Sequence, residues 1–193
     1  LEQFVQKFPQ HPLAAEAEFN RAQSYLHHAR QDQAIIVLQG LIANERFAST
    51  PQVPAAWNLL GVAYAAQKKF AEAISAWRSF LDKFPTDPKW SGVQRVIIDT
   101  EFAAAEEQFT RLDFPAARTA WETFLNKYPL DPRVALILYR FGQMHYDAAV
   151  KMATSVKAPA KLKPEQQAGV NQLLATALED WQRLVSKYPD TTE

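Results

Sequence analysis

The chain has 193 residues, 48% of them hydrophobic and only five of them glycine, so it is long enough and apolar enough to fold around a core. Lys and Arg together number 21, as do Asp and Glu, and this balance lacks the basic excess with which a general nucleic-acid binder neutralises phosphates. The absence of cysteine excludes disulfides, cysteine-ligated zinc and thiol catalysis, and no apolar run approaches the ~20 residues that span a bilayer.

A ten-residue motif recurs along the chain. It is SFLDKFPTDP at residues 79–88 and TFLNKYPLDP at residues 123–132, with weaker copies, QFVQKFPQHP and RLVSKYPDTT, at residues 3–12 and 183–192. Proline breaks a helix interior but is tolerated in the first helical turn. The motif is therefore predicted to mark the places where one helix stops and the next begins.

The individual positions of the motif support a joint between two helices. Pro85 prevents the first helix from continuing, Asp87 is placed as an N-cap, and Pro88 is placed at the first position of the next helix. Asp131 and Pro132 repeat this arrangement. We assign the motif to architecture, so function is expected on the helix faces between the joints.

Between the joints the apolar residues recur about every 3.6 residues, which predicts helices, and no hairpin signal for strands is present. Residues 1–8 are expected to be the closing turns of a helix, and the chain is expected to be a segment of a longer protein. Four helix hairpins are then predicted in chain order, at about residues 12–48, 52–87, 88–131 and 132–189.

Two of these hairpins depart from a regular spacing. The first helix of the third hairpin is expected to be lengthened at its start, where the apolar stripe is continued by Trp90, Val93, Ile97 and Ile98. In the last hairpin, two long helices are expected at about residues 132–154 and 164–187. An exposed loop at residues 155–164 is expected to join them.

One stretch carries a family signature, with large and small residues at fixed spacing: Trp57, Leu60, Gly61, Tyr64, Ala73, Trp77, Phe80 and Pro85. This pattern resembles the tetratricopeptide repeat, a helix hairpin of about 34 residues. The resemblance implies an all-α fold, a right-handed superhelix of antiparallel helix hairpins with about nine helices, forming one repeat domain over residues 1–193. Gly61 and Ala73 would let the helices of a hairpin approach closely, and Trp77, Trp121 and Trp181 would pack between hairpins.

The irregular repeat lengths resemble those of bacterial envelope proteins. These include the outer-membrane assembly lipoproteins, the Tol–Pal cell-division coordinator and the repeat segments ahead of bacterial macroglobulin-like domains. The resemblance implies a place in the bacterial periplasm or cell envelope, with the cytoplasm as the alternative, and flanking domains in the same chain. It does not choose among these proteins.

No pattern of residues points to catalysis, a cofactor or a metal. The four histidines, His11, His27, His28 and His145, are not spaced as metal ligands, and adjacent carboxylates on one helix cannot converge on a substrate. No nucleophile elbow or phosphate-binding loop is present. We therefore predict that the chain is not an enzyme and has no cofactor.

The lysines of the loop at residues 155–164, Lys157, Lys161 and Lys163, allow two interpretations. They could contact an acidic partner or anionic lipid, or they could simply keep an exposed loop soluble. Neither interpretation involves insertion into a membrane, and no nucleic-acid partner is expected.

In the family that the chain resembles, partners bind on the concave surface that the first helices of the hairpins line. The corresponding positions here are Phe19, Gln23, Asn58, Val62, Phe102, Glu106, Phe109, Tyr139, Gln143 and Tyr146. Aromatic and amide side chains suit an extended or helical peptide. The basic carboxylate clamp of the co-chaperones is absent, because Phe19, Gln23 and Leu59 stand at its places.

The predicted function is a non-catalytic scaffold that binds a peptide or protein partner on this concave face. The alternative is a structural spacer within a larger envelope protein, with no ligand of its own.

Overall fold

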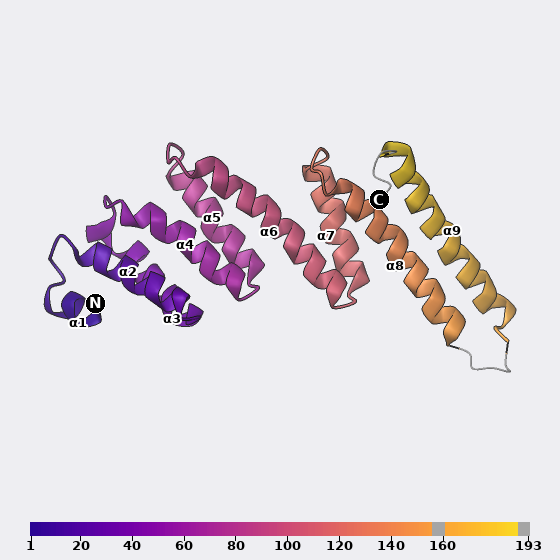
Figure 1. Cartoon of the computed structure of the whole chain (residues 1–193), viewed down its shortest axis with the longest axis horizontal. Helices are drawn as coiled ribbons and strands as arrows, with labels where there is room; N and C mark the ends of the chain where they lie inside the picture. Colours follow the sequence, from indigo (N-terminus) through magenta and orange to yellow (C-terminus); the bar gives the residue numbers. More distant parts are fainter. Residues whose placement is uncertain (156–160, 189–193) are drawn as a thin grey trace. The chain divides into compact units, whose positions relative to one another are not determined.

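The computed structural model describes residues 1–155 and 161–188, and within these ranges the chain forms nine α-helices, one short 3-10 turn and no strand (Figure 1). This confirms the predicted all-α, tetratricopeptide-like fold. The helices are α1 (Glu2–Lys7), α2 (Ala14–His27), α3 (Gln31–Ala43), α4 (Gln52–Ala66), α5 (Phe70–Lys83), α6 (Trp90–Thr110), α7 (Phe114–Lys127), α8 (Val134–Thr154) and α9 (Pro164–Lys187).

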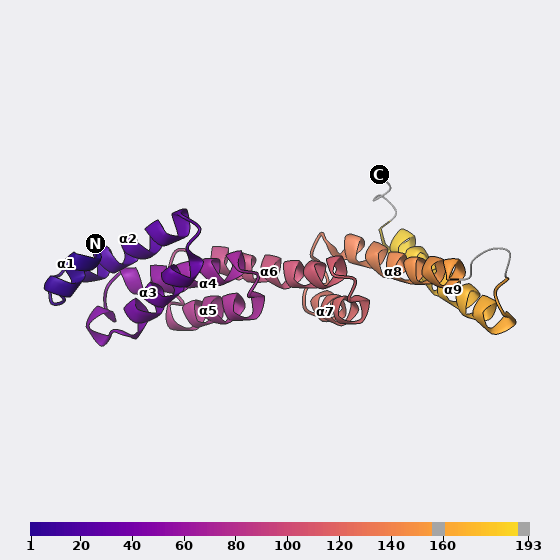
Figure 2. The ribbon, with the colours of Figure 1, turned by 90° about the horizontal axis from the view of Figure 1, so that it is seen from below.

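The chain divides into two compact units, Leu1–Ala104 and Ala105–Glu193, and the boundary falls within α6. In the first unit α2 packs on α3, α3 on α4, and α4 on α5. In the second unit α8 and α9 lie side by side along their length (Figures 1 and 2). A single repeat domain over residues 1–193 and a right-handed superhelix stay predictions.

The two long helices expected near the end of the chain are confirmed as α8 and α9. The lengthened first helix of the third hairpin is α6, in which Val93 and Ile97 are buried and face α5. Of the lysines in the loop, Lys157 lies outside the described residues, and Lys161 and Lys163 are exposed.

Small residues let the helices of the first unit approach closely. A Cβ added to Gly61 in α4 would lie 2.4 Å from the indole of Trp77 in α5, which is closer than any real contact. Ala73 in α5 is completely buried. The predicted role of both residues in close helix packing is therefore confirmed, and the same arrangement recurs in the second unit, where Gly142 in α8 lies against Trp181 in α9.

The three repeated tryptophans are not equally buried. Trp77 is 1% exposed and Trp121 is 0% exposed, which confirms that both pack in the core. Trp181 is only half-buried, so the prediction holds for it in part. Its indole nitrogen donates a hydrogen bond to the backbone oxygen of Tyr139 at 3.1 Å, as that of Trp77 does to Asn58.

The helices that follow the two joints were predicted to start two residues too early. Helix α6 begins at Trp90 and α8 at Val134, rather than at the prolines before them. The Asp–Pro pair forms a separate turn, in which the carboxylate of Asp87 accepts from the backbone nitrogen of Lys89 at 2.8 Å. The Nδ1 atom of His11 accepts from the nitrogen of Leu13 in the same way, at 3.1 Å, so the weaker copy at residues 3–12 uses the same device.

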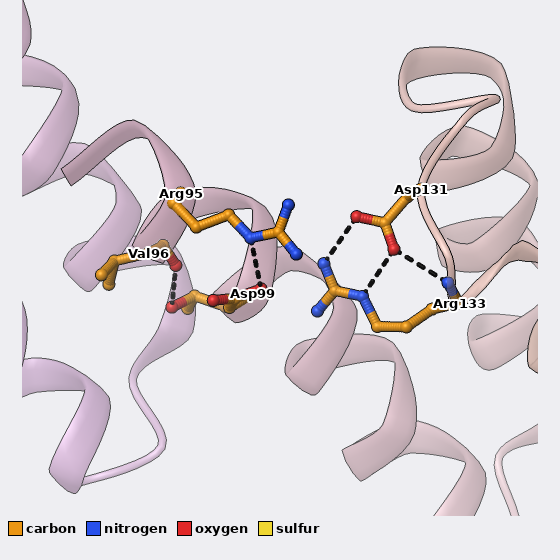
Figure 3. A network of polar contacts seen from close by, with 6 residues as sticks. Arg95, Val96, Asp99, Asp131 and Arg133 are labelled. Carbon is orange, nitrogen blue, oxygen red and sulfur yellow. Dashed lines mark hydrogen bonds and ion pairs between the residues drawn. The ribbon is translucent and has the colours of Figure 1, made fainter. Parts of the chain in front are cut away.

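The corresponding carboxylate in the second unit makes more contacts. Asp131 accepts from the backbone nitrogen of Arg133 at 3.0 Å and from its guanidinium at 2.7 and 2.9 Å, and only 4% of its side chain is exposed (Figure 3). Figure 3 also shows the ion pair within the first unit between Arg95 and Asp99, at 3.6 Å.

We expect the substitution Asp131→Ala to lower the free energy of unfolding by about 1–2 kcal/mol, because it deletes a buried carboxylate together with the charge-assisted hydrogen bonds that this carboxylate accepts. Asp87→Ala should cost about 0.5–1 kcal/mol, because the hydrogen bond that Asp87 accepts from Lys89 is exposed, whereas those of Asp131 are partly buried. Urea denaturation followed by circular dichroism measures both losses. Equal losses at the two positions would contradict the larger role of Asp131.

Candidate functional site

The ten predicted groove residues lie on the first helices of the hairpins, as expected, and none of them is buried. Gln23, Val62, Tyr139 and Tyr146 are exposed, and the other six are half-buried. Five belong to the first unit, namely Phe19, Gln23, Asn58, Val62 and Phe102; the second unit contains Glu106, Phe109, Tyr139, Gln143 and Tyr146.

In the first unit these residues have mixed roles. Phe19 packs against the core cluster between α2, α3 and α4. The side-chain oxygen of Asn58 accepts from the indole nitrogen of Trp77 at 3.0 Å, so Asn58 joins two helices of one hairpin. Gln23 and Val62 remain on the surface.

A hollow of the first unit is lined by other residues. It has a volume of about 310 Å³ and lies between α3, α4 and α5, where Trp57, Tyr64 and Glu72 contribute to its wall. Gln39 donates to the hydroxyl of Tyr64 at 3.0 Å at the same place. The sequence did not suggest this hollow. Its wall is formed by α3 and α5, which are the second helices of their hairpins, together with α4, and sequence reasoning looked for a binding surface on the first helices.

In the second unit, Arg140 connects three of the predicted residues. Its Nη1 atom donates to the side-chain oxygen of Gln143 at 2.9 Å, and its Nη2 atom lies 3.9 Å from a carboxylate oxygen of Glu106. The guanidinium carbon lies 4.6 Å from the ring centre of Phe109. Arg140 thereby holds α8 against the end of α6, and its half-buried guanidinium strengthens these contacts because water is partly excluded.

Sequence reasoning missed Arg140. The available signal was its spacing, because Arg140 lies three residues before Gln143 and therefore on the same side of α8. The Nε atom of Arg140 and the Oε1 atom of Glu106 are buried and have no hydrogen-bond partner among the described residues. The cluster therefore contains one hydrogen-bond donor and one acceptor that its own side chains leave unpaired.

Tyr139 and Tyr146 provide an aromatic surface beside this cluster. Their rings lie 6.4 and 6.0 Å from the ring centre of Trp181, and the Tyr139 ring is stacked on it. Both tyrosines pack against Trp181 and are nevertheless exposed. Rigid, partly exposed aromatic side chains are the residues that most often anchor a protein partner.

A second polar group in this unit joins three helices. Arg118 of α7 donates to Nε2 of His145 on α8 at 2.6 Å, and that atom lies 3.7 Å from a carboxylate oxygen of Asp180 on α9. Since arginine can only donate, Nε2 of His145 accepts in this contact. His145 was predicted to have no carboxylate at metal-binding spacing, and the part of the chain that the structure describes contains no group of three potential metal ligands. The arrangement ties helices together.

A family model described as YfiO, outer membrane lipoprotein, matches residues 62–192, which is more than half of the chain. Among curated proteins, none matches significantly. A solved structure from Bacteroides ovatus ATCC 8483, provisionally described as a protein binding protein, aligns at 16% identity over 92% of this chain and 91% of that chain, with a TM-score of 0.43. That likeness is too distant to bear on function. Among the described helices, none is long and apolar enough to cross a membrane.

Proposed function

The chain belongs to the YfiO family of outer membrane lipoproteins, and we propose that it is a non-catalytic scaffold that binds a peptide or protein partner on the first helices of its hairpins. The family supports a protein-interaction role and a place in the bacterial cell envelope. The partner would be protein rather than nucleic acid, since the net charge is zero. Flanking domains of the same chain would present this module to its partner.

The face of α8 around Tyr139 and Tyr146 is the proposed centre of binding. The observation that carries this proposal is the packing of both exposed rings against Trp181, next to the Arg140 cluster. The tyrosines would supply apolar anchors, and the unused polar atoms of Glu106 and Arg140 would become available to a partner if the cluster opened.

A capture experiment tests this proposal. The immobilised chain is incubated with envelope extract, the captured protein is identified and purified, and its binding is measured by calorimetry. We expect Tyr139→Ala combined with Tyr146→Ala to weaken that binding at least about tenfold, as truncation of aromatic anchors does. The backbone oxygen of Tyr139, which accepts from Trp181, is retained in this variant.

The matched control is Leu130→Ala, in the same unit, because Leu130 is 95% exposed and lies in the connection before α8. This variant should bind as the unaltered chain does. Equal binding by the tyrosine variant and the control would show that the face of α8 is not the site. If purified partners fail to bind the unaltered chain, the structural spacer becomes the better explanation.

A further inference from the structure

The hollow of about 310 Å³ between α3, α4 and α5 has one charged side chain on its wall among the described residues, that of Glu72. Glu72 is exposed, and within the described part of the chain no cation pairs with it, not even Lys69, which lies three residues before it. Gln39 of α3 donates to the hydroxyl of Tyr64, so the side-chain oxygen of Gln39 remains available as an acceptor. These groups favour a ligand that carries a positive charge and donates hydrogen bonds.

The remainder of this wall is largely apolar. Trp57 and Tyr64 are seven residues apart on α4, so both lie on the side of the helix that borders the hollow. Ile42 and Ala76 add aliphatic surface from α3 and α5. Arginine suits both parts of the wall, because it has an alkyl stem, a planar cation that stacks on aromatic rings and five N–H donors.

A second hollow of the first unit shows an arginine in an equivalent place. The first two hairpins align when Tyr25 of α2 is placed on Tyr64 of α4. In this alignment Arg21 corresponds to Leu60, and Arg21 lines a hollow of about 260 Å³ between α1, α2 and α3. The guanidinium of Arg21 lies 2.7 Å from the carboxylate of Glu18, and 21% of the Arg21 side chain is exposed. In one of two equivalent hollows, the chain itself therefore places a guanidinium beside a carboxylate.

The hollow between α3, α4 and α5 has a carboxylate but, among the described residues of its wall, no arginine. Leu60 stands where the other hollow has Arg21. Ser75 stands where the other hollow has Ile36, and its smaller side chain leaves more room. The larger volume and the unpaired charge are therefore both available to a guanidinium that the chain does not supply there.

We propose that this hollow binds an arginine side chain of a partner protein. The guanidinium would pair with Glu72, and the alkyl stem would lie against Trp57 and the aliphatic wall. The residues of this hollow belong to the first unit and differ from Tyr139 and Tyr146, so the hollow is an interaction site beyond the proposed function.

Two blocked tripeptides test the proposal. One has an arginine between two alanines, and the other has citrulline, which has nearly the same shape but no charge, in place of the arginine. Binding is measured by NMR as a saturable shift of the indole N–H signal of Trp57. We expect the unaltered chain to bind the arginine peptide at least about fivefold more tightly than the citrulline peptide, because only the former pairs with Glu72. With Glu72→Gln this preference should disappear.

Three further variants make the result specific. Glu45→Gln neutralises another exposed acid of the first unit and should leave the preference for arginine unchanged. Ser75→Ile gives this hollow the side chain that the other hollow has, and should weaken binding of the arginine peptide. Tyr146→Ala, in the face proposed above for the partner, should leave it unchanged, so a failure of that face is distinguishable from a failure of this site. Glu72 and Ser75 are exposed, so their variants should keep the helical circular dichroism and the urea midpoint of the unaltered chain.

Four results would overturn the proposal. Absence of a saturable shift, or equal affinity for the two peptides, would exclude a guanidinium site. An equal loss with Glu45→Gln and Glu72→Gln would mean general attraction to acidic residues. Tighter binding of butylguanidine than of the arginine peptide would assign the hollow to a small molecule. A dimer in sedimentation that Glu72→Gln dissociates would mean that a second copy of this chain occupies the hollow.

Discussion

Replacing Trp121 by alanine is expected to lower the free energy of unfolding of the second unit by about 3–5 kcal/mol. Trp121 is 0% exposed, and its ring centre lies 5.4 Å from that of Phe109 on α6 and 6.2 Å from that of Phe141 on α8. Alanine would leave a cavity where three helices meet, and close-packed helices collapse into such a cavity only in part. Urea denaturation monitored by circular dichroism measures the loss as a lower midpoint.

Trp181→Ala is the matched comparison, because Trp181 holds the equivalent position in the next hairpin. We expect a loss of about half that at Trp121, since a half-buried side chain removes less apolar surface from water. Equal losses at the two positions would mean that Trp181 is covered in solution by something other than the described residues. The losses would be measured at two protein concentrations. A loss at Trp181 that changes with concentration would show that a second copy of the chain covers it.

Gly61→Ala is expected to destabilise the first unit by about 1–3 kcal/mol, although alanine is the better helix former. The added Cβ would lie 2.4 Å from the indole of Trp77, and Trp77 is fully buried and held by hydrogen bonds to Asn58. The ring therefore cannot move aside without separating α4 from α5. The same denaturation experiment measures the effect.

Gly40→Ala is the control that gives the opposite sign. Gly40 lies inside α3, and a Cβ added there meets nothing within 4 Å. Only the helix propensity changes, so the substitution should stabilise the chain by up to about 1 kcal/mol. Stabilisation at both positions would show that Trp77 adapts to a larger neighbour and that the close approach at Gly61 is not required.

The joints between helices could be predicted from the sequence because the rules that govern them are local. Proline ends a helix, and the carboxylate of Asp87 accepts a hydrogen bond from the backbone nitrogen of Lys89, two residues later. The helix starts were nevertheless placed two residues too early, at Pro88 and Pro132. A separate Asp–Pro turn with its own backbone hydrogen bonds, including that from Trp90 to Asp87 at 3.0 Å, precedes each helix.

Residues of the candidate site were harder to predict. Tyr139, Gln143 and Tyr146 were placed on one helix from the repeat spacing alone, and their use as a binding face stays a prediction. Arg140 was missed, because a single charged residue on a helix is usually solvated and its contacts with Glu106 and Phe109 come from another helix. Spacing along one helix cannot show what a neighbouring helix brings to it.

By itself, the sequence determined that this chain is helical, where its helices are joined, and that Gly61 and Ala73 let the helices of a hairpin approach closely. These features depend on neighbours within one or two helices, so local propensity and spacing are sufficient to define them. The tertiary structure alone decided how deeply equivalent residues are buried. Trp77 and Trp181 have the same place in the repeat, but among the described residues Trp77 is packed in a cluster with Val93 and Ile97 of the next helix while Trp181 is half-buried, because burial depends on the segments that pack from outside the hairpin.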